Sequence, residues 1–65
     1  MITITRLNDK EIVINAELIE TVEETPDTTI TMTTGRKYIA KETSEEIIKK
    51  IVEYKRKIFY NHINE

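Results

Sequence analysis

Hydrophobic and polar residues alternate through much of the first 42 residues, with the period of two that is typical of strands buried on one face. In the opening segment, Ile2 and Ile4 face one side and threonines face the other. Threonine is frequent throughout this part of the chain, and its β-branched side chain favours strands. The pattern predicts five short strands, at residues 1–5, 11–15, 17–24, 28–32 and 37–41.

Turn-forming residues separate these segments. Asn8 and Asp9 tolerate the positive φ of a tight turn, so the first two strands are expected to form a hairpin. Pro26 and Asp27 begin a second turn, and Gly35 supplies the positive φ of a third. A phosphate-binding loop would need several glycines followed by a helix, whereas the segment "TTGRK" has one glycine and precedes a strand. We therefore interpret Gly35 as a hairpin corner.

Residues 17–24 fit two patterns, because Leu18, Ile19 and Val22 also match helical spacing. Pro26 disfavours a helical conformation in the residue before it, which argues against a helix that ends here. The segment is therefore predicted as a strand, with Leu18 and Val22 on one face and Ile19 on the other.

Residues 44–60 have the pattern of one amphipathic helix. Thr43 is the expected N-cap, and Glu46, three residues later, completes a capping box. The hydrophobic residues form two neighbouring stripes, at positions 47, 51, 54 and 58 and at positions 48, 52 and 59. Lysine, arginine and glutamate occupy the opposite side. Residues 61–65 are expected to form a short tail.

The hydrophobic side of this helix is wide for a helix that covers only one small sheet. About 17 helical residues span roughly 25 Å, whereas strands of five residues span only about 17 Å. The end of the helix is therefore expected to extend beyond the sheet and to offer a contact surface for a partner or for another copy. The residues expected in that surface are Tyr54, Ile58, Phe59 and Tyr60.

Together these elements predict one α+β domain over residues 1–65. Its expected architecture is a small antiparallel β-meander of about five strands within residues 1–42, followed by one C-terminal α-helix. Whether the sheet forms an SH3-like barrel or a partly open barrel stays open at this point.

Composition narrows the classes of protein that the chain can represent. The chain has 65 residues, no cysteine and one histidine, His62, so it contains neither disulfides nor thiolate metal sites. The formal net charge of −2 argues against a dedicated nucleic-acid-binding domain. The first residues lack the pattern of a secretory signal, and no apolar stretch approaches the ~20 residues that span a bilayer. A cytoplasmic protein that is not membrane-spanning is therefore expected.

The chain offers little that could perform catalysis. Ser44 is the only serine, it falls in the first helical turn, and His62 lies near the end of the chain. The adjacent carboxylates at Glu23–Glu24 and Glu45–Glu46 point apart on a strand or a helix. We therefore expect no enzyme, no catalytic residue, no cofactor and no metal site. The basic segment "KKIVEYKRK" is interpreted as a solvated helix face, because no second basic strip accompanies it.

Four segments of the chain resemble the FlbD family of small flagellar proteins. These are "TRLN" at 5–8, "NAELIETVE" at 15–23, "TPDTTIT" at 25–31 and "TGRKYIAKE" at 34–42, and the resemblance extends from residue 2 to about residue 58. The family commonly has Asn-Gly at both hairpin corners. Here the corners are Asn8-Asp9 and Thr34-Gly35, which bears on the type of turn more than on membership.

The resemblance implies a non-catalytic accessory protein of bacterial flagellar motility, including swarming, at the cytoplasmic side of the flagellar base. It implies protein–protein interaction with a motor or stator protein, and we expect the chain to act as a homo-oligomer. The alternative is a small nucleic-acid-binding β-barrel regulator, since short barrels with one helix often bind RNA or DNA. The acidic net charge and the single strand aromatic residue, Tyr38, disfavour that alternative. A third possibility is a purely structural subunit that assembles with itself.

Overall fold

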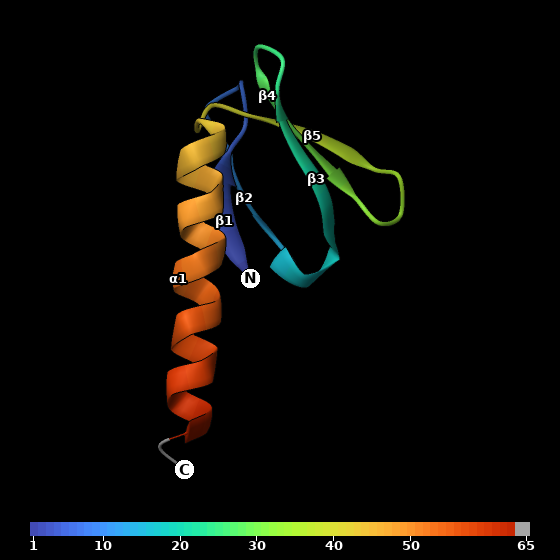
Figure 1. Ribbon diagram of the computed structural model, residues 1–65. Helices are drawn as coiled ribbons and strands as arrows, with labels where there is room; N and C mark the ends of the chain where they lie inside the picture. The colour runs from blue at the N-terminus through green and yellow to red at the C-terminus, as the bar shows by residue number, and fades with distance from the viewer. Residues whose placement is uncertain (64–65) are drawn as a thin grey trace.

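A computed structural model describes the backbone of residues 1–63 and the side chains of residues 1–59. Five strands precede one long C-terminal helix, which confirms the α+β class predicted from the sequence (Figure 1). The strands are β1 (Ile2–Thr5), β2 (Glu11–Ile14), β3 (Ile19–Glu24), β4 (Thr28–Met32) and β5 (Lys37–Ala40). A short 3-10 helix, η1 (Ala16–Leu18), lies between β2 and β3, and the helix is α1 (Ser44–Ile63).

The strands form two antiparallel sheets rather than one continuous meander. Strands β1 and β2 pair as a hairpin, and the second sheet has the order β3-β4-β5. The sheets meet at one corner, where Arg6 forms an isolated bridge with Ala40 and the Lys41 N–H donates to the Thr5 carbonyl oxygen at 2.8 Å. Strands β2 and β3 do not pair, because η1 separates them. The strands therefore do not close into a barrel.

The predicted turns at Asp9 and Gly35 are confirmed. Asp9 has a φ of 67°, and its N–H donates to the Arg6 carbonyl oxygen at 2.9 Å. Gly35 has a φ of 91°, and its N–H donates to the Met32 carbonyl oxygen at 2.9 Å. Each residue type permits the left-handed backbone that its hairpin requires.

The prediction for residues 17–24 is correct for the strand but wrong for its start and its faces. The Asn15 side chain accepts the Glu17 N–H at 3.0 Å, which starts η1 and removes Leu18 from the strand. The pairing of β3 with β4 then shifts between Ile19 and Thr21, at a bulge. The extra residue brings Ile19 and Val22 to the same inward face, and both are half-buried.

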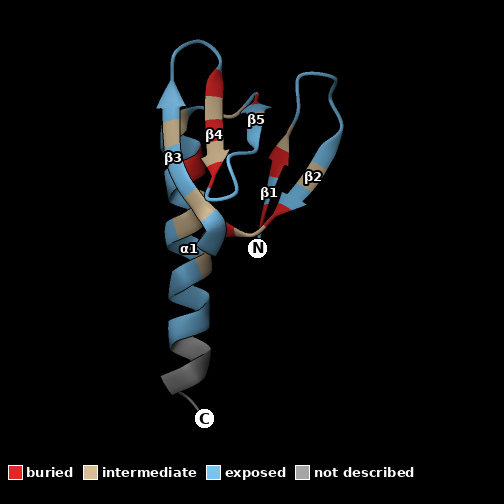
Figure 2. Cartoon of the chain, turned by 90° about the vertical axis from the view of Figure 1, so that its right-hand side faces the viewer, coloured by how far each residue is buried: buried red, intermediate tan, exposed pale blue. Residues whose placement is uncertain are grey.

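The hydrophobic core lies between the two sheets and α1. Strands β1 and β4 supply half of its buried hydrophobic residues and are coloured as buried in Figure 2, and α1 contacts β1 and β3. The buried hydrophobic residues are Ile2, Ile4, Ile14, Ala16, Ile30, Met32, Ala40 and Ile47. These side chains come from both sheets and from the helix, so none of the three parts can bury its hydrophobic face alone.

Helix α1 begins as predicted and ends later than predicted. The Glu46 N–H donates to the Thr43 hydroxyl at 3.1 Å, and the Thr43 N–H donates to the Glu46 carboxylate at 3.0 Å, which is the expected capping box. The helix continues to Ile63, so residues 61–63 are helical rather than part of a tail. Its 20 residues span roughly 30 Å, and its lower part extends beyond both sheets (Figure 1).

Candidate interaction surface on helix α1 and strand β3

The connection between β5 and α1 is fixed to the first strand by Glu42. Its carboxylate accepts the Thr5 N–H at 2.9 and 3.1 Å and the Thr5 hydroxyl at 2.8 Å. Burial, the largest single influence, raises the pKa of the Glu42 carboxyl. The hydrogen bonds from the Thr5 backbone and hydroxyl, together with the Glu42 backbone N–H and the charge of Lys50, outweigh burial, so this pKa lies below its ordinary value. The carboxylate form of Glu42 therefore holds the start of α1 beside β1.

Strand β3 holds the first turn of α1 through Glu24. The Ser44 N–H donates to the Glu24 carboxylate at 2.7 Å. This backbone hydrogen bond, followed by that of the Ser44 hydroxyl, lowers the pKa of Glu24. A carboxylate at this position also matches the positive end of the helix dipole. The two glutamates together fix α1 across β1 and β3.

The inner stripe of α1, at positions 47, 51, 54 and 58, packs toward the core over most of its length. Ile47 is completely buried, with an exposed fraction of 0%, and Ile51 and Tyr54 are half-buried against the core. Ile58 continues the stripe beyond the sheets and is 48% exposed. The exposure rises along the stripe because the strands are shorter than the helix.

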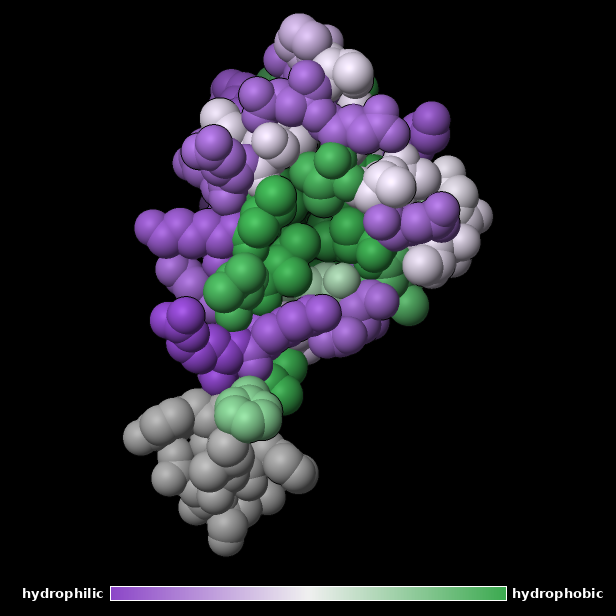
Figure 3. All heavy atoms as spheres, viewed as in Figure 1, coloured by the Kyte–Doolittle hydropathy of each residue, from purple (hydrophilic) through white to green (hydrophobic). Residues whose placement is uncertain are grey.

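The outer stripe of α1 stays exposed along its whole described length. Ile48, Val52 and Phe59 have exposed fractions of 53%, 48% and 66%. These positions lie about 100° around the helix axis from the inner stripe, so the core leaves them about half exposed or more. Figure 3 shows a hydrophobic area over α1 and the neighbouring strands, and a hydrophilic band separates it from a smaller hydrophobic area farther down the helix.

We use the name α1–β3 surface for the exposed Ile48 and Val52 of α1 together with the half-buried Ile19 and Val22 of β3, the strand that α1 contacts. Lysine, arginine and glutamate at positions 53 and 55–57 separate it in sequence from the lower pair, Ile58 and Phe59. An exposed hydrophobic area with a charged border is typical of protein–protein contacts.

The structure divides the four residues that the sequence predicts as an interaction surface. Ile58 and Phe59 are exposed at the end of α1, whereas Tyr54 is half-buried and packs against the core. The side chain of Tyr60 lies outside the described residues. Ile48 and Val52 were not in the predicted set, although the second stripe in the sequence pattern already contained both positions.

Charges are unevenly distributed along α1. Glu45 and Glu46 lie in the first turn, whereas Lys55, Arg56 and Lys57 lie in the second half. None of the described α1 side chains forms a salt bridge, so these charges remain available to a neighbouring molecule. A second helix that runs antiparallel to α1 would place its acidic end beside this cationic half.

No group of three or more histidine, cysteine, aspartate or glutamate side chains lies close enough to hold a metal ion among the described residues. Neither described helix has the combination of length and apolar character that a membrane span requires. The arrangement of α1 and β3 is suited to binding through hydrophobic contact.

Comparison with known protein families identifies the family of this chain. The family model of the flagellar and swarming motility proteins, FlbD, matches residues 1–59. Neither the curated proteins nor the solved structures contain a match. The matched residues include every strand and the first 16 residues of α1, from Ser44 to Phe59. The chain therefore belongs to the FlbD family of flagellar and swarming motility proteins.

Proposed function

We propose that this protein is a non-catalytic accessory protein of bacterial flagellar motility that acts by binding other proteins through α1. Membership of the FlbD family supports the role in motility. The observation that carries the binding mode is the outer stripe of α1, where Ile48 and Val52 stay about half exposed beside β3. Its binding partner in the cell is a motor or stator component at the cytoplasmic side of the flagellar base.

The protein acts as a homo-oligomer in this proposal. Two copies pair through their α1–β3 surfaces with antiparallel helices, so that Ile48 and Val52 of each copy lose contact with water. Glu45 of one copy then lies toward the cationic second half of the partner helix. The exposed helix ends, where Ile58 and Phe59 lie, add hydrophobic contact to this pairing, and the oligomer then docks on the flagellar component.

Complementation of motility tests this proposal. Deletion of the gene should reduce swimming and swarming, and the wild-type chain should restore both. The variant Ile48→Gln/Val52→Gln should restore neither, since it removes the hydrophobic contact while it keeps good helix formers. The matched control, Lys49→Gln/Glu53→Gln, changes two exposed residues on the other side of the same helix without changing net charge.

Cellular protein levels, measured by immunoblot, must be equal for all variants. Full motility with Ile48→Gln/Val52→Gln at wild-type level would exclude the α1–β3 surface as the binding site. Normal motility after deletion of the gene would contradict the role in motility itself.

A further inference from the structure

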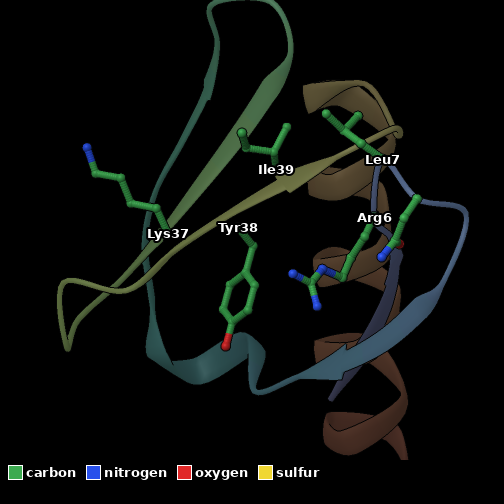
Figure 4. A pocket seen from close by; sticks show the side chains of 6 residues that line it. Arg6, Leu7, Lys37, Tyr38 and Ile39 are labelled. Carbon is green, nitrogen blue, oxygen red and sulfur yellow. The ribbon is translucent and has the colours of Figure 1, made fainter.

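Tyr38 of β5 lies where two shallow depressions meet, and neither depression is lined by α1. The first has a volume of about 350 Å³ and is lined by Arg6, Leu7, Asn8, Lys37, Tyr38 and Ile39 (Figure 4). The second, of about 430 Å³, continues from Tyr38 toward Arg36, Val13 and Leu18. We call the two together the Tyr38 groove. The residues that line the Tyr38 groove come from neither α1 nor β3, so the groove is separate from the α1–β3 surface.

The charge of the Tyr38 groove is opposite to that of the whole chain. Its lining contains Arg6, Arg36 and Lys37 and no aspartate or glutamate, although the chain has 12 acidic residues and a net charge of −2. The Arg36 Nη1 donates to the Tyr38 hydroxyl at 3.5 Å, and the Arg6 side chain points toward the Tyr38 ring in Figure 4. All three cationic side chains are exposed and can bind a carboxylate from solution.

Hydrophobic side chains border these cations. Leu7 and Ile39 line the first depression, lie on the same side of β5 in Figure 4, and are about half exposed. Val13 and Leu18 line the second depression and are also exposed. A ligand that carried only negative charge would leave these four side chains in water, so they indicate a ligand with apolar groups as well.

We propose that the Tyr38 groove binds an acidic, amphipathic peptide segment of a partner protein. Its carboxylates pair with Arg6, Arg36 and Lys37, and its apolar side chains cover Leu7, Ile39 and Val13. An extended segment with alternating acidic and apolar residues presents the two kinds of side chain to opposite sides, as the lining requires. The aliphatic border favours a peptide over a nucleic acid, since bases need aromatic side chains to stack on and the groove has one.

Fluorescence anisotropy with purified full-length protein tests this inference. The probe is a fluorescein-labelled peptide of alternating glutamate and leucine, which should bind. Arg6→Glu/Arg36→Glu should weaken binding roughly tenfold or more, because charge-assisted hydrogen bonds are lost and like charges are introduced. The matched control, Lys10→Glu/Lys49→Glu, makes the same change in net charge at two exposed residues that do not line the groove and should stay within about twofold of wild type.

A second pair of measurements isolates the hydrophobic border. Leu7→Ser/Ile39→Thr should weaken binding of the glutamate–leucine peptide and leave binding of a glutamate–serine peptide unchanged. Circular dichroism melting of each variant confirms that it is folded before its affinity is compared. Both substitutions fall on exposed side chains, so the fold should tolerate them.

Four results would overturn the inference. The first two are no binding of the glutamate–leucine peptide and equal weakening of its binding by both charge-reversed variants. The third is binding of oligouridylate in place of the peptide. The fourth is a fall in molar mass with Arg6→Glu/Arg36→Glu, which would show that the groove is a contact between copies. The experiment uses no motility readout and no α1–β3 variant, so it can fail or succeed independently of the proposed function.

Discussion

Glu42 and Thr5 are far apart in the sequence but are joined by hydrogen bonds. Its carboxylate accepts both the backbone and the hydroxyl hydrogen of Thr5, 37 residues earlier in the chain. The neighbouring Lys41 N–H bonds the Thr5 carbonyl oxygen, so the backbone of Thr5 is satisfied on both sides by this one segment. These hydrogen bonds are stronger to the ionised carboxylate than to the neutral acid, which makes the contribution of Glu42 dependent on pH.

Replacing Glu42 with glutamine should lower the free energy of unfolding by about 1 kcal/mol at pH 7, since charge-assisted hydrogen bonds are lost at a partly exposed site. The pKa of Glu42 is lowered in the folded state, so its contribution is complete above the ordinary value of 4.5 and disappears as the pH falls below it. Urea denaturation of the wild type and of Glu42→Gln at several pH values measures the difference in free energy of unfolding between the two proteins.

The difference in free energy between the two proteins should shrink below pH 4.5. The effect of Glu24 is present in both proteins and cancels in the comparison. Glu11→Gln, on the exposed face of β2, is the control and should change little. A Glu42→Gln difference that stays constant from neutral to acidic pH would show that the hydrogen bonds to Thr5 are not the source of the effect.

At the scale of elements, the sequence predicts those features that depend on neighbouring residues. The hairpin turns at Asp9 and Gly35, the capping box at Thr43 and the two stripes of α1 each follow from residues within one turn or strand. The bulge at the start of β3 does not, because it depends on the register between Ile19 and Met32 on a different strand. Burial of Tyr54 likewise depends on where the sheets end.

The candidate sites also differ in whether they depend on neighbouring residues or on residues that are far apart in the sequence. The exposed outer stripe could be predicted from helical periodicity, although its position beside β3 could not. The Tyr38 groove was not predicted at all. Arg6, Val13 and Tyr38 come from three separate segments, and only the meeting of the two sheets brings them to one surface.

Substitutions at Ile47 and Ile48 should distinguish the two stripes of α1. Ile47→Val removes one buried methyl group and should cost about 1 kcal/mol of unfolding free energy. Ile48→Val should cost at most a few tenths of a kcal/mol of unfolding free energy, because the Ile48 side chain is half exposed in the isolated chain. The two changes are chemically identical and adjacent in sequence, so their effects on helix propensity match. Thermal denaturation of dilute protein measures both, and equal losses would contradict the assignment of inner and outer stripes.

The whole molecule is elongated, with extents of 40 × 23 × 18 Å, because α1 continues beyond the sheets. Its hydrophobic core is small and, among residues 1–59, contains eight buried hydrophobic residues. Domains of this size bury a modest fraction of their surface and gain much from association. The exposed end of α1 and its outer stripe therefore matter to the stability of the assembly as well as to recognition.

Truncation of the chain after Lys57 should reduce association while it leaves the strands folded. It removes Ile58 and Phe59, which lie outside the core, and keeps Ile47 and Ile51. Light scattering of the full chain should give a molar mass above the 7.7 kDa of one copy, and the truncated chain should approach the mass of a single copy. Far-ultraviolet circular dichroism checks that the strands persist. An oligomer of unchanged size after truncation would show that the helix end has no role in self-association.

The placement of α1 against the first strand has a consequence for how the protein is made. Ile2 and Ile4 are synthesised about 40 residues before Ile47, yet all three belong to one core, and Glu42 holds Thr5. A chain still emerging from the ribosome therefore exposes its first hairpin until the start of α1 has been added. The core of a new copy is therefore complete only after Ile47 has been synthesised, so folding and partner binding both follow translation of the start of α1.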